Sequence, residues 1–379
     1  MSAVALDGVV RRYEWGSRTA IPRMLGIEPD GRPAAELWFG AHPDDPSAVP
    51  ERGATLDAVI GADPAGTLGA AVVDRFGPRL PFLLKVLAAD KALSMQVHPN
   101  LDQARAGYAR EDAAGIARDA PNRNYRDANH KPELLCALTP FDALCGFRPV
   151  ADSLALLEEL AVPELAFVAA ALRGTDPLRA AFTAVLTHSE PGPLVAAVAR
   201  RAAGAQDGPL HAVRIAAEDF PGDVGAVLAL LLNDIRLEPG EAIYLGAGNV
   251  HAYLRGTGVE IMANSDNVLR CGLTPKHVDV DELLRITDFT ELIEPRLIAT
   301  GGRFDVPVAD FSLIRLEIDG PTGRHDPGPS IVLCTEGAVT VGALRLGPGR
   351  AAFVPAAEPT ALSGTGLAFV GSVGQLTIP

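Results

Sequence analysis

The sequence predicts a mainly β fold of two jelly-roll barrels, with an all-helical domain inserted into the first barrel. Three observations lead to this prediction. Glycine (38 residues) and proline (31 residues) are spread along the 379 residues in tight turns, which is typical of many short strands. Residues 150–232 form one block of consecutive helical patterns. A strand-rich segment after the helices resembles a second one near the end of the chain.

These changes of pattern give the predicted domain boundaries. A chain of this length fits two or three domains of about 100–200 residues each. The first barrel is discontinuous and comprises residues 1–149 and 233–289. The helical insertion is 150–232, and the second barrel-like unit is 290–379.

Buried strands are expected in the first part of the chain. LPFLLKVLAA (80–89) is a continuous apolar run and leads into LSMQVHPN (93–100). Short apolar runs bounded by turn residues predict strands. The next segment, LDQARAGYAREDAAGIARD (101–119), is rich in alanine, arginine and acidic residues without proline, so it predicts a helix.

The segment after Pro149 changes to a helical period. ADSLALLEELAV (151–162) repeats leucine at helical spacing, with Asp152 or Ser153 as the expected N-cap. Further helices separated by glycine and proline are predicted at 177–186, 193–203 and 223–232.

A two-strand unit is used twice after the helices. Residues 237–265 and 346–372 both open with Leu-x-Pro-Gly, carry an aromatic residue four positions after that glycine, and reach Gly-Thr-Gly. The copies differ where chemistry is expected, because His251 and Glu260 fall opposite Thr360 and Ala368. One barrel is therefore predicted to carry chemistry, and the other is predicted to be structural and metal-free.

The charge of the chain restricts its partners. Thirty-three basic and 47 acidic residues give a net charge of −14. This field repels polyanions, so nucleic acid and anionic membrane surfaces are not expected as partners. A small anionic substrate stays possible in a local basic pocket.

Localisation is predicted to be cytoplasmic. The longest apolar run near residue 230, at 224–232, is far shorter than the roughly 20 residues of a membrane span. The first residues lack the apolar core of a signal peptide. The four cysteines show no metal-type spacing, which indicates reduced thiols.

Four side chains on three segments form a candidate metal set. Gln96 and His98 alternate along a predicted strand, so both point to one face. Glu133 ends a polar segment, and His251 stands at a strand entrance. Two imidazoles, a carboxylate and an amide oxygen suit Zn²⁺, and also Mn²⁺ or Fe²⁺. For any single histidine, a hydrogen-bonded structural role fits the spacing equally well.

A second set is suited to binding an anion. Lys85 lies in an apolar run, where an unpaired ammonium would be costly, so it needs an anionic substrate or a buried carboxylate. Arg270 and Lys276 share the polar stretch 263–277, which predicts a phosphate clamp or a solvated loop. Ser94 completes this set.

Four stretches carry a family resemblance: LKVLAADKALSMQVHPN, YRDANHKPELLCAL, GNVHAYL with GVEIMANSDNVLRCGLTPKH, and AELWFGAHP (35–43). Together they resemble the type I phosphomannose isomerases of the cupin superfamily. The resemblance runs from Tyr13 to about residue 285, and 290–379 fits only as a degenerate second barrel. It implies two cupin-type jelly rolls with a helical insertion, in agreement with the pattern above.

The resemblance also implies a site. One Zn²⁺ per chain is expected on Gln96, His98, Glu133 and His251. The substrate and its phosphate are expected on Ser94, Lys85, Lys276 and Arg270. The implied catalytic residues are Arg270, Lys131, Glu260, His130 and Asp266.

The implied reaction is the isomerisation of mannose 6-phosphate to fructose 6-phosphate through a cis-enediol, as part of mannose metabolism and GDP-mannose biosynthesis. Zinc would stabilise the developing enediolate. Glu260 and Lys131 are the candidate bases, with a zinc-bound hydroxide as a third. His130 is expected to assist ring opening, with Asp266 as its partner.

Three other functions stay open at this point. A non-catalytic sugar-phosphate-binding cupin is disfavoured by Lys131, Glu260 and Arg270, because a binding protein needs no base. A metal-dependent oxygenase is disfavoured by the phosphate-type cations. An isomerase of a related sugar phosphate would differ by only a few hydroxyl contacts. Monomer and homodimer are both compatible with the sequence.

Overall fold

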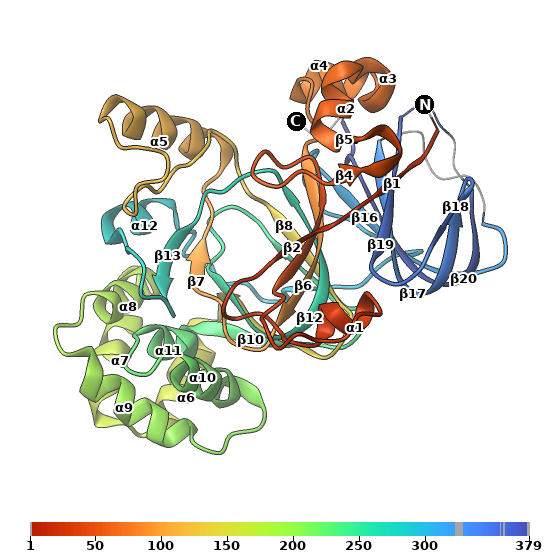
Figure 1. Cartoon of the computed structure of the whole chain (residues 1–379). Coiled ribbons are helices and arrows are strands. Elements are labelled where there is room, and N and C mark those ends of the chain that lie inside the picture. The colour runs from red at the N-terminus through yellow and green to blue at the C-terminus, as the bar shows by residue number, and fades with distance from the viewer. Residues whose placement is uncertain (1, 323–328, 357, 359–360, 377–379) are drawn as a thin grey trace.

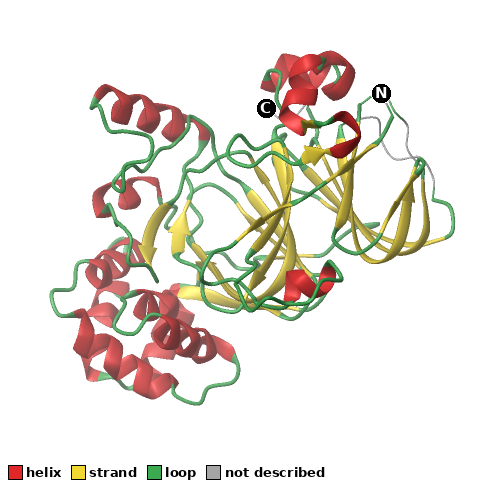
Figure 2. Ribbon diagram, viewed as in Figure 1, coloured by secondary structure: helices red, strands yellow, loops and turns green. Residues whose placement is uncertain are grey.

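The computed structural model describes residues 2–322, 329–356, 358 and 361–376. About 30% of the chain is helical and 31% is strand, so the fold is mixed α and β rather than mainly β as predicted (Figure 2). The difference arises because helices also form outside the predicted insertion. These are α1 (Ala20–Met24), α2 (Leu56–Ala62), α3 (Pro64–Leu68), α4 (Ala70–Phe76), α5 (Leu101–Ala113), α12 (Val280–Ile286) and the 3₁₀ turn η1 (Pro50–Arg52).

The larger sheet has eleven strands and occupies the centre of the molecule (Figure 1). Its main path runs β14 (Arg296–Leu297), β11 (Ala242–Leu245), β8 (Glu133–Ala137), β12 (His251–Ala263), β6 (Phe82–Ala89), β3 (Glu36–Gly40) and β2 (Val9–Arg11). Beside this path lie β7 (Met95–Val97), β9 (Phe141–Phe147), β10 (Leu232–Leu237) and β13 (Leu269–Gly272). The long strand β12 pairs with β6, β7, β8 and β9, and so joins the two parts of this sheet.

The second sheet has seven strands, drawn mostly in blue at the right of Figure 1. Its order is β1 (Val4–Leu6), β19 (Arg350–Val354), β17 (Ser330–Val341), β20 (Leu362–Ser372), β16 (Ser312–Asp319) and β15 (Arg303–Phe304), with β18 (Leu344–Leu346) paired to β17. A separate pair is formed by β4 (Ala48–Val49) and β5 (Ala54–Thr55). Strand β1 belongs to the predicted first barrel but lies on the second sheet, and β14 belongs to the predicted second unit but lies on the first sheet.

The predicted repeat corresponds to the same strand order in both sheets. In each copy a short strand, β11 or β19, is followed in sequence by a long one, β12 or β20. The two do not pair directly, because another strand lies between them: β11-β8-β12 in one sheet and β19-β17-β20 in the other. Glu260 and Ala368 therefore occupy equivalent long strands, whereas Thr360 lies outside the described residues.

A block of helices separates β9 from β10, at the lower left of Figure 1. It contains α6 (Val150–Leu160), η2 (Pro163–Leu165), α7 (Ala166–Leu172), α8 (Pro177–Leu186), α9 (Pro191–Ala202), α10 (Gly208–Asp219), α11 (Gly225–Leu228) and η3 (Ala229–Leu231). The helices predicted at 151–162, 177–186 and 193–203 correspond to α6, α8 and α9. The helix predicted at 223–232 is only the two short turns α11 and η3, and α6 is N-capped by Pro149 rather than by Asp152 or Ser153.

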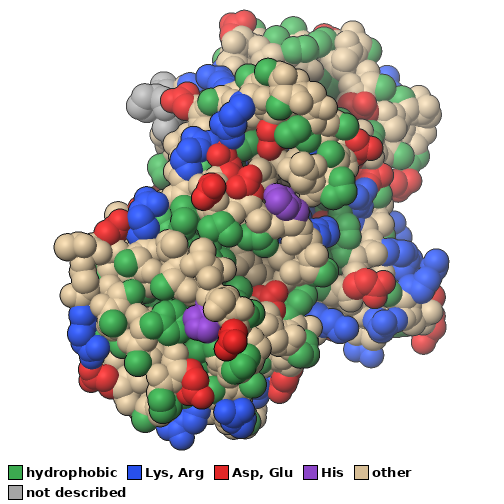
Figure 3. All heavy atoms as spheres, turned by 90° about the vertical axis from the view of Figure 1, so that its left-hand side faces the viewer, with side chains coloured by type: hydrophobic (Ala, Val, Ile, Leu, Met, Phe, Trp, Pro, Cys, Tyr) green, Lys and Arg blue, Asp and Glu red, His purple; other side chains and the backbone are tan. Residues whose placement is uncertain are grey.

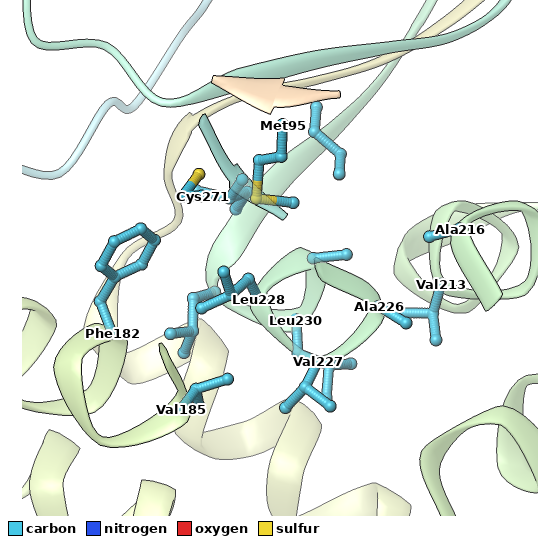
Figure 4. Close-up of a cluster of buried hydrophobic side chains, with 14 of the residues drawn as sticks. Met95, Phe182, Val185, Val213, Ala216, Ala226, Val227, Leu228, Leu230 and Cys271 are labelled. Carbon is cyan, nitrogen blue, oxygen red and sulfur yellow. The ribbon is translucent and has the colours of Figure 1, made fainter. Parts of the chain in front are cut away.

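One hydrophobic core connects these helices to the strands of the larger sheet. In Figure 4, Met95 of β7 and Cys271 of β13 lie close to Leu228 of α11, with Val227 and Phe182 on the helical side. A second core fills the space between the two sheets, where Phe82 and Ile261 share a cluster with Phe369. The helical block and both sheets are therefore held together by buried apolar contacts.

In the part of the chain that the structure describes, no helix has both the length and the apolar character of a membrane span. On the face shown in Figure 3, Lys and Arg side chains are interspersed with Asp and Glu. Before residue 120, β6 forms as expected, α5 ends at Ala113 rather than at Asp119, and β7 is limited to three residues.

Candidate metal centre and active site

Three buried side chains from separate segments converge on one point. His98 follows β7, Glu133 begins β8 and His251 begins β12. Their potential ligand atoms lie within 4.8 Å of one another. Nε2 of each imidazole is 3.5 Å from Glu133 Oε2. The structure thus brings together three of the four predicted metal ligands.

Backbone carbonyls orient the two imidazoles. His98 Nδ1 lies 2.7 Å from the Asn267 carbonyl oxygen, and His251 Nδ1 lies 3.0 Å from that of Asn249. Because a carbonyl only accepts, each Nδ1 carries the hydrogen and each Nε2 keeps its lone pair. This arrangement is the usual support for a metal-binding histidine.

The donor atoms fit a divalent cation. His98 Nε2 and Glu133 Oε2 are buried, and neither has a hydrogen-bond partner within the described ranges. A buried polar atom without a partner is costly, so such atoms indicate a missing ion or water. Two imidazole nitrogens and a carboxylate oxygen are common ligands of Zn²⁺.

The protonation states also fit metal binding. Burial lowers the pKa of His98 to about 4, against the opposing charge of Glu133. Burial alone would raise the pKa of Glu133, but the nearby Lys131 ammonium holds it well below its usual value. Lys131 Nζ lies 3.2 Å from Glu133 Oε1, the oxygen that does not face the histidines. Neutral imidazoles and an ionised carboxylate are the metal-binding forms.

Gln96 and Arg270 lie in one row with His251 across β12, β7 and β13. Gln96 is paired with His251 on one side and with Arg270 on the other. Directly paired residues on neighbouring strands point to the same face. The Gln96 amide nitrogen is 3.4 Å from His251 Nε2, and Ser94 Oγ is 3.5 Å from the Gln96 amide oxygen. The fourth predicted ligand therefore lies beside His251, one of the other three.

Glu260 lies on the same sheet in a buried network of charges. It is paired with Lys85 on β6 and with Leu135 on β8, two residues from Glu133. Lys85 Nζ is 2.5 Å from Glu260 Oε2, and the Tyr253 hydroxyl donates to Glu260 Oε1 at 2.6 Å. Burial raises the pKa of Glu260, although the charge of Lys85 opposes this effect.

Glu36 extends this network and was not predicted as a site residue. Its Oε1 lies 3.2 Å from Lys85 Nζ, and its Oε2 accepts from the Trp38 indole at 2.6 Å. Burial would lower the pKa of Lys85, but Glu260 and Glu36 raise it above its usual value. Of the two partners that the sequence left open for Lys85, the structure shows buried carboxylates. The contact of Lys85 with phosphate stays a prediction. Two quoted motifs were the available signals: AELWFGAHP contains Glu36, and GNVHAYL contains Tyr253.

Three cations form a cluster next to the metal ligands. Partial burial together with Arg270 and Arg126 lowers the pKa of Lys276, and burial together with Arg126 lowers that of Arg270. Among the described residues, no carboxylate forms an ion pair with Arg126, Arg270 or Lys276. Neighbouring cations without carboxylate partners are suited to an anion such as phosphate. Arg126 was not predicted.

His130 and Asp266 do not form the expected pair. His130 Nε2 lies 3.0 Å from Asp310 Oδ2, in the segment that leads into β16. Asp266 instead lies 3.7 Å from His42 and 3.4 Å from Arg118. The pairing was wrong because it depended on how the segment around Asp310 packs on the loop before β8. The roles of His130 and Asp266 at the substrate stay predictions.

Comparison with known proteins gives the family. The chain is 41% identical to the mannose-6-phosphate isomerase of Escherichia coli, over 94% of this chain and 96% of that protein. The chain belongs to the type I phosphomannose isomerases. The catalytic domain of that family, phosphomannose isomerase type I, matches residues 4–150. The mannose-6-phosphate isomerase of Bos taurus is 34% identical, over 94% of each chain.

Solved structures of the family share the fold. A zinc-bound mannose 6-phosphate isomerase has a TM-score of 0.91 and 38% identity, and covers 99% of this chain and 100% of that chain. A point mutant of the phosphomannose isomerase from Salmonella typhimurium has the same TM-score at 37% identity, with the same coverage. The predicted family and isomerase class are confirmed. The predicted zinc is supported by the zinc-bound neighbour and by the triad of His98, Glu133 and His251.

Proposed function

We propose that this chain interconverts mannose 6-phosphate and fructose 6-phosphate, with one Zn²⁺ held by Gln96, His98, Glu133 and His251. The observation that carries the proposal is the row of Arg270, Gln96 and His251, which places a cation without a carboxylate partner beside the metal ligands. A sugar phosphate offers both groups that such a row would recognise, hydroxyl oxygens for the metal and a phosphate for the cations.

The cations hold the substrate by its non-reacting end. Arg270, Lys276 and Arg126 bind the phosphate, and Ser94 adds a hydroxyl near the Gln96 amide. Binding energy gained at the phosphate then orients the carbonyl end of the opened sugar at the metal ligands. When bound, zinc acts as a Lewis acid that stabilises negative charge on the substrate oxygens.

Glu260 is the proposed base. It takes the proton from C2 of the open-chain aldose and delivers it to C1, so that the substrate passes through a cis-enediol. Burial raises the pKa of its carboxyl group, which favours proton transfer near neutral pH. Lys85 and Tyr253 hold the two carboxylate oxygens in place. The Lys131 ammonium is paired with Glu133, so we assign Lys131 to that ligand rather than to the proton.

We further propose that the two sheets are two cupin-type jelly-roll barrels and that 150–232 is the helical insertion between parts of the first. The equal strand orders β11-β8-β12 and β19-β17-β20 support this division. The second barrel carries Ala368 where the first carries Glu260. The four cysteines are free and buried, which is consistent with a reducing cytoplasm.

Isomerisation in deuterium oxide tests the enediol and the base together. A proton that passes through Glu260 exchanges with solvent, so NMR should find deuterium at C1 of fructose 6-phosphate. Glu260→Gln should lose about 10²–10⁴-fold in turnover while keeping its zinc. Complete retention of the substrate hydrogen together with undiminished turnover in Glu260→Gln would contradict the enediol and the base.

A further inference from the structure

One carboxylate of the helical block holds the backbone that precedes Lys276. Asp223 Oδ1 accepts from the Gly225 N–H at 2.7 Å and from the Leu273 N–H at 2.8 Å, and Oδ2 accepts from the Thr274 N–H at 3.1 Å. Leu273 follows β13 directly, and Lys276 comes two residues after Thr274. Asp223 therefore connects α11 to the end of the strand that carries Arg270.

The backbone held by Asp223 has an unusual conformation. Leu273 has φ = +51°, in the left-handed region that residues other than glycine rarely adopt. Such a conformation persists only where surrounding contacts fix it, and it is often found at functional sites. Asp223 supplies two of these contacts through the N–H groups of Leu273 and Thr274.

Close packing fixes the same turn from the other side. A Cβ atom at Gly272 would lie 2.7 Å from the Gly225 Cα, and one at Gly225 would lie 2.7 Å from Leu273 Cδ2. The two backbones can approach this closely because both positions are glycine. The buried Leu273 side chain belongs to the same core as Leu228 and Cys271, the core drawn in Figure 4.

The turn continues into the proposed phosphate-binding lysine. The Lys276 N–H donates to Thr274 Oγ1 at 3.1 Å, so the residue anchored by Asp223 also anchors Lys276. Lys276 is exposed and has a long flexible side chain, which loses conformational freedom when it binds an anion. A fixed backbone at Thr274 reduces the number of positions that the Lys276 ammonium can reach.

We propose that Asp223 is a positioning residue for phosphate recognition: it fixes the Leu273–Thr274 turn so that Lys276 stays beside Arg270. The inference rests on the proposed role of Lys276 in binding the substrate phosphate. It gives the helical block a part in substrate binding, although Asp223 itself does not touch the substrate.

The test compares Asp223→Asn with a matched control, Asp219→Asn. Asp219 also connects the helical block to the larger sheet, because it accepts from the Ala92 N–H at 2.7 Å and from Arg255 at 2.6 and 3.0 Å, but it does not contact the turn before Lys276. Asp223→Asn should weaken binding of inorganic phosphate about tenfold by calorimetry, and raise KM for mannose 6-phosphate about tenfold with kcat within about twofold. Asp219→Asn should leave both within about twofold of the wild type. Asp223→Ser is a second variant of the same contact.

A double-mutant cycle with Lys276→Ala decides whether Asp223 acts through the lysine. Asp223→Asn should have no further effect on phosphate binding once Lys276 is alanine. An equal loss in both backgrounds, or an equal loss in Asp219→Asn, would overturn the inference. Phosphate binding that depends on Asp223 in a chain unable to isomerise mannose 6-phosphate would support the positioning role and overturn the proposed function. Full isomerase activity with phosphate binding independent of Asp223 would overturn the positioning role alone.

Discussion

His98 and His251 turn the same nitrogen, Nε2, toward one oxygen of Glu133, and each does so at 3.5 Å. Their ring centroids are 5.0 Å apart, and a backbone carbonyl fixes the Nδ1–H of each ring. The ligand geometry is thus set by the backbone of the loops around Asn249 and Asn267. Such support is expected to hold the metal-binding form of both histidines before the metal arrives.

Glu133→Ala should lose metal and activity together. Removing the carboxylate takes away the oxygen that both Nε2 atoms face, so zinc affinity should fall by more than the roughly 10–100-fold typical of supporting residues. Metal analysis of the purified protein and an isomerase assay measure both effects. Glu158→Ala, at an exposed position on α6, is the control. Stoichiometric zinc with normal turnover in Glu133→Ala would show that the ligand assignment is wrong.

Lys85→Met should destabilise the fold. It leaves Glu36 and Glu260 buried without their cation, and breaking a buried ion pair costs about 3–5 kcal/mol. Adding Glu36→Gln removes one of the two carboxylates that have lost their cation. The free energy of unfolding of the double variant should therefore exceed the value expected from adding the two single effects by at least about 1 kcal/mol. Urea unfolding of the four proteins measures this coupling, and strictly additive values would contradict it.

The ionised Glu282 carboxylate should contribute to the free energy of unfolding at neutral pH and not in strong acid. Burial alone would raise its pKa, but hydrogen bonds from Arg285, Tyr125 and Arg110 lower the pKa to about 2. Because this value lies below the ordinary 4.5, the stabilisation is complete above about pH 4.5 and is lost as the pH falls toward 2. Glu282→Gln should therefore unfold more easily than the wild type at pH 6, and the difference should shrink near pH 2.5. A difference that does not change with pH would contradict this account.

Each cation of the cluster should contribute to KM. Arg126→Ala, Arg270→Ala and Lys276→Ala should each raise KM for mannose 6-phosphate about tenfold or more, because a charge-assisted phosphate contact is lost. Added salt should weaken substrate binding further, through screening of the remaining charges. Arg105→Ala on the exposed face of α5 is the control. Unchanged KM in Arg126→Ala would remove Arg126 from the site.

Local patterns predicted the elements that have one apolar face. Helices α6, α8 and α9 have patterns of this kind and form close to where they were predicted, as does strand β6, which was predicted from a continuous apolar run. The segment 223–232 was predicted as one helix but forms two short turns. Residues 225–232 are all buried, so no polar face exists to define a helical period.

Residue types suggested the candidate ligands, but only the motifs of a known family assigned them to one site. Gln96, His98, Glu133 and His251 come from segments far apart in sequence, and their convergence depends on the pairing of β7 with β12. Spacing alone carries no information on such long-range pairing. The contacts of Glu36, Asp223 and Asp310 depend on tertiary packing in the same way, and none of the three was expected.

The central claim is that the four ligands hold a zinc ion that this chain needs to isomerise mannose 6-phosphate. The most direct measurement is a coupled assay with mannose 6-phosphate on the purified protein, before and after a chelator, with Zn²⁺ then added back. The account predicts activity that disappears with the chelator and returns with zinc. Activity that persists in metal-free protein, or its absence from protein that holds one zinc per chain, would contradict it.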